Sequence, residues 1–390
     1  MAGATTFAPS KVDVAVDVGQ RKPASVVSHA RILELDGFRA AAVLMVLISH
    51  LFYGWPLGDA GLSWLPRGLV VAIAHGWFGV DLFFILSGFL ITGILLDSKD
   101  SQHYFSNFYT RRVLRIMPLY FTCILIFCFA YPAHRSYLAL SFLFLANFFH
   151  AFRVQAPHGP AVFWSLAVEE HFYLLWPLLV RFLKRAWLFA LTLIIVFGTP
   201  ILRGICTHAG MDPEAEIYTY SFFRFDGLAL GAIIALWVRS RYYSRSSAWK
   251  LAGFLAGFSL LVTVVGWPYG IMQSKTVTSE AFRYTQAQFL FAGAMALAIA
   301  YRGSPFTGFL RSRFARITAE LSYCIYLIHL SLGDGYYWVL RSIGFHDAQR
   351  LGAPGALAVR SLVIVILTFG LAALSKKYLE DPFLRLKRYF

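Results

Sequence analysis

The stretch "LELDGFRAAAVLMVLISHLFYGW", residues 33–55, is apolar enough to cross a lipid bilayer as one helix. Two ionisable residues nevertheless stand in it, Arg39 near its start and His50 deep inside. They are eleven positions apart, and a rotation of about 100° per residue places both side chains on one helix face, roughly 16 Å apart along the axis. Ionisable side chains are costly in hydrocarbon and usually mark a functional site.

The composition is that of a protein with many membrane-spanning helices. The chain has 390 residues, of which 58% are hydrophobic and 14% charged, whereas soluble domains carry about 25% charged residues. Its mean hydropathy is +0.61. The net charge of +15 is scattered among short loops, which indicates topology-setting charge rather than nucleic-acid binding. The four cysteines have no metal-ligand spacing and are typical of buried small side chains.

The apolar runs predict an all-α, polytopic integral membrane protein of about ten transmembrane helices. The run at 137–150 is short, and counting it as an eleventh span would move most of the later basic loops outside. We therefore expect it to be a short re-entrant or interfacial helix, with both termini in the cytosol. The ten predicted spans are residues 36–54, 75–96, 113–131, 163–180, 187–203, 222–238, 250–268, 285–301, 318–340 and 357–375.

The chain is expected to contain one folded domain. Residues 1–30 are polar, weakly patterned and without the apolar core of a signal peptide, so they predict a disordered cytosolic tail. Residues 31–390 show no repeat and no second composition, which indicates one integral-membrane domain. In this orientation Arg39 lies near the cytosolic surface, and His50 lies past the middle of the bilayer.

Three arginines open the predicted third span, in "YTRRVLRIMP", residues 109–118. Arg112 and Arg115 share a helix face, and Arg111 is a neighbour of Arg115 on the helix surface. Guanidinium groups match phosphate oxygens, so the cluster predicts binding of a phosphate-bearing cofactor from the cytosol. Anchoring of the helix end by positive charge is the alternative.

Further polar residues in the predicted spans are candidates for a site. Glu169 at the outer end of its span could meet His50 and orient the imidazole ring. A polar residue in a span can also have a purely structural role. It can pack against a neighbouring helix, favour a helix start as an acid, or pair with another intramembrane charge. No phosphate-binding glycine loop, nucleophile elbow or metal-ligand pair occurs, and no metal is expected. The candidates are Asp81, Ser87, Ser165, Glu169, Arg224, Tyr326 and His329.

Seven motifs in order resemble the membrane-bound acyltransferase family 3, which includes O-antigen and other bacterial carbohydrate O-acetyltransferases. The resemblance implies ten core spans in the bacterial inner membrane, an acetyl-CoA or other acyl-CoA donor bound from the cytosol, and a hydroxyl acceptor that is often a sugar. The motifs are "LDGFRAAAVLMVLISH", "GVDLFFILSGFLIT", "RRVLRIMPLY", "FWSLAVEEHFYLLWP", "FRFDGLALGAIIA", "SYCIYLIH" and "YLEDPF".

The same resemblance implies roles for individual residues. His50 takes the place of the catalytic histidine and Arg39 that of its paired arginine, while Arg112 and Arg115 take the place of the pair linked to the CoA phosphates. We add Arg111 and Ser87 as candidate donor contacts. Candidate acceptor contacts are Asp81, Ser165, Arg224, Tyr326 and His329.

The hypothetical mechanism uses neutral His50 as a general base. It removes a proton from the acceptor hydroxyl as that oxygen attacks the thioester, while Glu169 or Asp36 orients the ring. Arg39 or a hydroxyl group would stabilise the oxyanion. Direct transfer and an acyl-histidine intermediate both stay open.

Two other functions fit the same composition. A proton-coupled transporter or flippase of a cell-envelope precursor would use buried charges as a pathway, but predicts inverted repeats with broken helices, and the sequence shows none. A scaffold would leave His50 and the arginine cluster without a purpose. We therefore expect a membrane-embedded O-acyltransferase whose partners are the bilayer, acyl-CoA and a sugar or glycoconjugate acceptor, and not nucleic acid.

Overall fold

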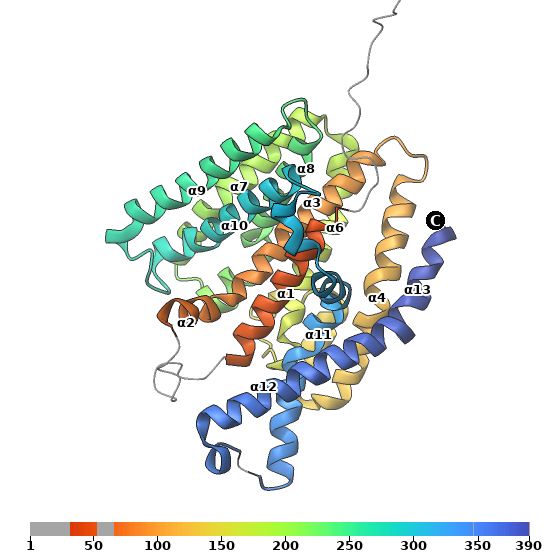
Figure 1. Cartoon of the computed structure of the whole chain (residues 1–390), viewed down its shortest axis with the longest axis vertical. Helices are drawn as coiled ribbons and strands as arrows, with labels where there is room; N and C mark the ends of the chain where they lie inside the picture. Colours follow the sequence, from red (N-terminus) through yellow and green to blue (C-terminus); the bar gives the residue numbers. More distant parts are fainter. Residues whose placement is uncertain (1–31, 53–65, 346, 390) are drawn as a thin grey trace, which may run out of the picture.

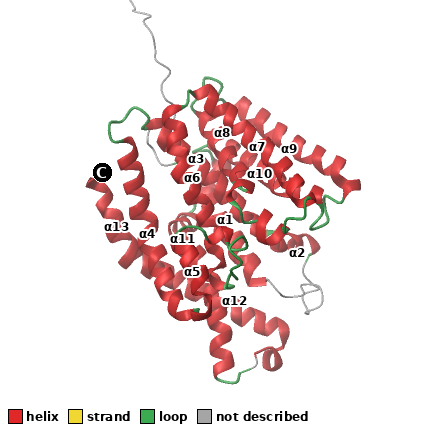
Figure 2. Ribbon diagram, turned by 180° about the vertical axis from the view of Figure 1, so that it is seen from behind, coloured by secondary structure: helices red, strands yellow, loops and turns green. Residues whose placement is uncertain are grey.

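A computed structural model describes residues 32–52, 66–345 and 347–389, and most of this part of the chain is helical (Figure 1, Figure 2). No β-strand occurs within these ranges. The all-α prediction is therefore confirmed. The predicted tail, residues 1–30, lies outside the described residues.

The long helices follow the apolar runs of the sequence. In the part of the chain that the structure describes, each of the ten predicted spans overlaps one long helix. These are α1 (Glu34–Phe52), α3 (Gly79–Asp97), α4 (Tyr104–Ala130), α6 (Phe163–Phe182), α7 (Arg185–His208), α8 (Phe225–Val238), α9 (Arg245–Gly266), α10 (Val277–Ala300), α11 (Arg313–Ser342) and α12 (Asp347–Ser375).

The length and composition of these helices are those of a polytopic membrane protein. Among the described residues, six helical stretches are long and apolar enough to cross a membrane, or seven if α10 and the bent segment Pro305–Arg311 are one span. The helix α8 has 14 residues and is short for a crossing, while α6 and α11 carry several charged residues. The number of ten crossings stays a prediction.

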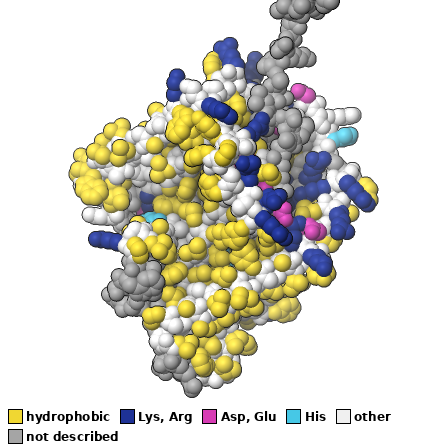
Figure 3. Space-filling view, viewed as in Figure 1, with side chains coloured by type: hydrophobic (Ala, Val, Ile, Leu, Met, Phe, Trp, Pro, Cys, Tyr) yellow, Lys and Arg dark blue, Asp and Glu magenta, His cyan; other side chains and the backbone are white. Residues whose placement is uncertain are grey.

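Large apolar side chains cover much of the outer surface. On α9, Leu260, Leu261 and Val264 are exposed, and on α12 Leu362 and Ile366 are exposed. Figure 3 shows hydrophobic side chains over broad areas of one face, with Lys and Arg gathered toward the upper and right-hand parts of the view. Such apolar helix faces suit contact with lipid rather than water.

Side-chain caps and one glycine explain where several helices begin. Ser244 accepts a hydrogen bond from the Ser247 backbone at the start of α9, and Ser312 caps α11 in the same way. Helix α12 is broken at Gly352, whose φ of +69° is favourable for glycine. Its apolar part therefore begins at Pro354, close to the predicted start of the tenth span.

The short apolar run at 137–150 forms no long helix. The helix α5 (Arg135–Phe142) is followed by a tight turn at Phe144, with φ of +57°, and by a 3-10 turn at Ala146–Phe148. It is therefore short, as predicted, and its position at the membrane surface stays a prediction. Two short helices were not predicted, α2 (Arg67–Ala74) and α13 (Asp381–Arg385), and α13 packs beside α4 (Figure 1).

Glycines allow the central helices to pack closely. A β-carbon added at Gly88 of α3 would lie 1.9 Å from the carbonyl oxygen of Leu228, and one at Gly231 of α8 would lie 2.1 Å from that of Ile85. The backbones of α3 and α8 thus meet without side chains between them. Helix α1 packs against α3 and α11, and this brings its ionisable residues into the interior.

Candidate functional site

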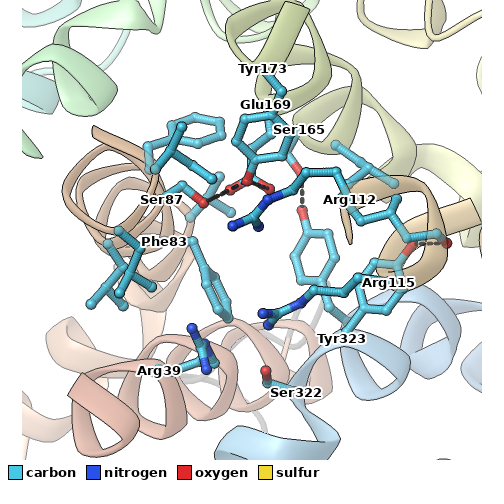
Figure 4. A pocket seen from close by; sticks show the side chains of 18 of the residues that line it. Arg39, Phe83, Ser87, Arg112, Arg115, Ser165, Glu169, Tyr173, Ser322 and Tyr323 are labelled. Atoms are coloured by element: carbon cyan, nitrogen blue, oxygen red, sulfur yellow. Dashed lines mark hydrogen bonds between the residues drawn. The ribbon is translucent and has the colours of Figure 1, made fainter. Parts of the chain in front are cut away.

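A cavity of about 250 Å³ lies between α1, α3, α4, α6 and α11 (Figure 4). Three arginines line it, Arg39 from α1 and both Arg112 and Arg115 from α4. Much of the remaining wall is apolar, as at Phe83 and Leu327. We call this space the arginine cavity. It brings together the arginine of the first span and the basic cluster of the third.

A hydrogen-bonded group of three residues forms one wall of the arginine cavity. Ser87 donates to Glu169 Oε1 at 2.6 Å, and the Tyr173 hydroxyl donates to Glu169 Oε2 at 3.1 Å. The Arg112 guanidinium lies over the Tyr173 ring, 5.5 Å from its centroid. Among the described residues that line the cavity, Glu169 is the single acid. Three guanidinium groups against one carboxylate make the space suitable for an anion.

His50 is paired with a second histidine. Its Nδ1 lies 2.8 Å from Nε2 of His329, and the two rings are stacked with centroids 5.0 Å apart. Nδ1 of His329 faces the carbonyl oxygens of Tyr326 at 2.9 Å and Ile325 at 3.1 Å. Carbonyl oxygens only accept, so the proton of neutral His329 sits on Nδ1 and its Nε2 accepts from His50. Neutral His50 therefore keeps its lone pair on Nε2.

The partner of His50 is a histidine and not the acid that the sequence led us to expect. Glu169 is bonded to Ser87 and Tyr173 instead. Asp36 lies 3.8 Å from Arg39, about four helix turns from His50 on the same helix. The residue that orients the ring is His329, which the sequence analysis assigned to the acceptor. The reason is that α11 packs against α1 at this level, and cross-helix contacts are not encoded in the period of either helix.

A second cavity, of about 240 Å³, contains the histidine pair. It lies among α1, α11, α12 and the loop before α6, and we call it the histidine cavity. His158 Nδ1 is 2.8 Å from Asp334 Oδ1, and the Tyr131 hydroxyl donates to Asp334 Oδ2 at 2.8 Å. Sequence reasoning did not single out these residues. The acid at 334 near the end of an apolar helix was the available signal.

Tyr326 lies between the two cavities. It lines the arginine cavity, and its ring centroid is 6.0 Å from that of His329. Its hydroxyl is 2.6 Å from Ser165 Oγ. Tyr326, bonded to Ser165, is thus a residue of the arginine cavity that also lies near the histidine pair.

Comparison with known sequences identifies the family of the chain. A family model described as an acyltransferase domain, acyltransferase 3, matches residues 32–375. The chain belongs to this acyltransferase family. No solved structure matches it.

Relatives of this acyltransferase domain come from several bacteria. YrhL of Bacillus subtilis is 29% identical over 385 residues, covering 91% of this chain and 55% of that protein. The O-acetyltransferase OatA of Staphylococcus aureus is 27% identical, covering 89% of this chain and 56% of its own length. The peptidoglycan O-acetyltransferase OatA of Listeria monocytogenes is 31% identical over 238 residues, 55% of this chain and 35% of that protein. The chain therefore spans about half the length of YrhL and of the Staphylococcus protein.

Two charged residues predicted to bind the acceptor lie elsewhere in the acyltransferase domain. Arg224 pairs with Asp81 at 2.8 Å, and both are fully buried. Gln288 also donates to Asp81 at 2.8 Å, and Tyr284 lies under the guanidinium with its centroid 4.3 Å away. Neither charged residue lines either cavity. Mutual pairing of intramembrane charges, the alternative that the sequence left open, describes them.

Of the remaining predicted residues, two line the arginine cavity and one lines neither cavity. Ser87 of α3 and Ser165 of α6 line the arginine cavity, while Arg111 of α4 does not. Among the described residues, no group of three His, Cys, Asp or Glu side chains could hold a metal ion. The arrangement therefore offers a space suited to an anion and a second space lined by a pair of imidazole groups, with Tyr326 of the first near His329 of the second.

Proposed function

We propose that the protein is a membrane O-acyltransferase that moves an acyl group, acetyl by analogy with its relatives, from acyl-CoA to a hydroxyl of a carbohydrate or glycoconjugate. One observation carries the proposal: an anion-binding cavity with three arginines adjoins a cavity that holds a paired imidazole. The pantetheine arm of acyl-CoA is long and thin. One donor molecule could therefore have its phosphates in the arginine cavity and its thioester near His50.

In the proposed reaction the arginines hold the donor. Arg112 and Arg115 bind the phosphates of acyl-CoA, because guanidinium forks match phosphate oxygens. Tyr173 positions the Arg112 guanidinium, which lies over its ring, and Glu169 holds the Tyr173 hydroxyl.

Arg39, which also lines the arginine cavity, adds a third cation for the donor phosphates. It lies roughly 16 Å from His50 along α1, too far to stabilise negative charge on the thioester oxygen, the role expected from the sequence. Arg360 is the arginine that lines the cavity with His50.

His50 is the proposed general base. Its Nε2 takes the proton of the acceptor hydroxyl while the hydroxyl oxygen attacks the thioester carbonyl carbon. The C–O bond forms, the C–S bond breaks, and the CoA thiolate leaves with the proton that His50 releases. His329 holds the reactive tautomer, since its Nε2 accepts from His50 Nδ1. Each atom and charge is accounted for without a metal.

The proposed setting is the bacterial inner membrane, with both termini in the cytosol. The printed names of the relatives include peptidoglycan O-acetyltransferase, which supports a glycan of the cell envelope as acceptor. Cytosolic acyl-CoA and an outer glycan would then approach the reacting atoms from opposite sides. The inner-loop positive charge supports this orientation.

The decisive experiment is acyl transfer from labelled acetyl-CoA by membranes that carry the wild type or His50→Ala at equal protein level. Loss of a general base should lower transfer at least about 100-fold. His208→Ala is the matched control, because His208 is exposed at the end of α7 and lines neither cavity. Transfer that survives in His50→Ala would contradict the mechanism. Thiol release that needs no glycan would contradict the transferase reaction.

A further inference from the structure

The histidine cavity has an exposed rim and a buried floor. At the rim, the His158 side chain is 53% exposed and that of Asp334 is 30% exposed. At the floor, His329 is 3% exposed, and it bonds to His50. A ligand that enters past the rim therefore meets the base at the bottom. This inference rests on the proposed function, because it assigns the site of the acceptor.

The rim is held in place by three separate parts of the chain. Tyr131 follows α4, His158 lies in the loop before α6, and both bind the carboxylate of Asp334 on α11. Gly159 allows this approach, since a β-carbon there would lie 2.2 Å from the Tyr131 hydroxyl and 2.5 Å from Ser331 Oγ. The carboxylate is thus fixed before any ligand arrives, as recognition of a specific hydroxyl requires.

The floor is also fixed from a distant helix. Arg360 of α12 is buried, with 6% exposure. It donates to the Tyr337 hydroxyl and to the backbone carbonyl of Leu51. Because Leu51 follows His50 directly, this contact holds the end of α1 against α12. The base is therefore positioned from both its side chain and its backbone.

The lining of the histidine cavity differs from that of the arginine cavity. It combines one arginine and one carboxylate with imidazole groups, a tyrosine and several aliphatic side chains. It therefore has no excess of cationic groups comparable to the three arginines that line the other cavity. A few directional polar groups on an otherwise apolar wall suit a ring that has both hydroxyl groups and C–H faces.

We propose that the histidine cavity is the acceptor site and binds one sugar residue of a glycan, with one hydroxyl at Nε2 of His50 and a neighbouring hydroxyl on the Asp334–His158 pair. In the transfer, the first hydroxyl gives its proton to His50 and its oxygen to the acyl carbon, while the second hydroxyl only fixes the ring. Asp334 and His158 are accordingly positioning residues, and they select a polyhydroxylated acceptor.

The first test separates acceptor binding from donor binding. Asp334→Asn keeps the shape of the side chain but weakens its acceptance of hydroxyl and imidazole hydrogen bonds. It should raise the KM for soluble peptidoglycan glycan strands about tenfold or more. The Kd for CoA should stay within about twofold of the wild type. Equal loss of CoA binding would overturn the assignment, and so would an unchanged glycan KM.

A second test fills the cavity. A β-carbon at Gly333 would lie 3.8 Å from Ile364, an ordinary contact, so Gly333→Leu can place its side chain in the histidine cavity that Gly333 lines. Gly335→Leu is the matched control, because a β-carbon at Gly335 meets nothing within 4 Å. Gly333→Leu should abolish the rise in melting temperature that glycan strands give the wild type, and keep the rise given by CoA. The control should keep both.

The outcomes distinguish the two proposals. Glycan transfer by the wild type that does not depend on His50 would overturn the proposed function, and the acceptor site with it. Transfer that depends on His50 but is unaffected by Asp334→Asn and Gly333→Leu would overturn the acceptor site alone. If Asp334→Asn does not fold, as judged by CoA binding, His158→Gln tests the same rim at its more exposed residue.

Discussion

At the residue scale, the His50–His329 pair fixes which nitrogen can act as a base. Two backbone carbonyls hold the proton of His329 on Nδ1, so its Nε2 is an acceptor for His50. This contact orients the His50 ring and fixes its tautomer, as a carboxylate partner commonly does, but it adds no charged group to the interior.

His329→Phe should therefore lower kcat while the KM for acyl-CoA stays within about twofold. Without an acceptor for its Nδ1 proton, the His50 ring loses both its orientation and its preferred tautomer, and a loss of about 10–100-fold is expected from the effect of such partners elsewhere. His329→Gln offers an amide oxygen and should recover part of the rate. Steady-state kinetics on purified protein checks both, and equal rates for the two variants would contradict the role.

The arginine cavity predicts a dependence on phosphate groups. Arg112→Gln should weaken the binding of CoA about tenfold or more, because a charged hydrogen-bonded contact is lost. The affinity for acetyl-pantetheine, which carries no phosphate, should not change. Calorimetry with the two ligands measures this difference. A parallel loss for both ligands would mean that Arg112 supports the structure of the cavity rather than the phosphates.

The rim of the histidine cavity predicts a pH dependence of acceptor binding. The hydrogen bond to Asp334 raises the pKa of His158 above its ordinary value of about 6.5, against the smaller opposing effect of burial. The folded protein thus holds this proton more tightly. The ion pair is complete below about pH 6.5 and is lost as the pH rises through the raised pKa. The KM for glycan should therefore increase above neutral pH.

The effect on KM can be separated from titration of the base. The titratable and charged groups that line the cavity with His158 are Asp334, His50, His329, Tyr337 and Arg360. The Tyr131 hydroxyl shares the Asp334 carboxylate with it. His158→Gln cannot ionise, so its glycan KM should be flat over the same pH range while kcat keeps its own profile. A KM that still rises in this variant would assign the titration to another group.

At the element scale, contact between α3 and α8 depends on glycine. Gly88→Ala should destabilise the protein by about 1–3 kcal/mol, because the new β-carbon would lie 1.9 Å from the Leu228 carbonyl oxygen and backbone must move. Gly198→Ala on α7, where a β-carbon meets nothing within 4 Å, is the control. Melting temperatures in detergent compare the two. A Gly88→Ala protein as stable as the control would contradict the packing.

The helices were predictable from the sequence because a helix that is surrounded by lipid or protein must consist largely of apolar residues. All ten runs became helices, and the short run at 137–150 did not form a long one. Helix ends were less predictable. Helix α4 begins at Tyr104 rather than 113, so its arginines lie within the helix and not at its start.

Several of the residues singled out from the sequence line the two cavities, but their contacts could not be predicted. Arg112 and Arg115, expected to share a helix face, line one cavity together. Arg39, expected to act beside His50, lines this same cavity instead.

The partner of His50 was not foreseen, because a contact between α1 and α11 depends on how two helices cross. The role of Asp334 was not predictable for a similar reason. Its partners, Tyr131 and His158, lie in two loops that no sequence period connects to α11.

At the scale of the whole molecule, the two cavities lie near opposite ends of α1. Arg39 lines the arginine cavity near the beginning of α1 and His50 lines the other near its end, so the axis of α1 joins them. If the loop charge sets the orientation, the arginine cavity lies toward the cytosol, where acyl-CoA is made, and the rim of the histidine cavity lies toward the envelope.

This orientation can be tested by labelling from one side of the membrane. A cysteine in place of the exposed His158 should react with an impermeant maleimide in intact cells, and one in place of the exposed Lys377, which follows α12, only after permeabilisation. The wild type, with its own four cysteines, gives the background. The opposite pattern would place the three arginines on the envelope side, where no acyl-CoA is available, and the proposed division between donor and acceptor would fail.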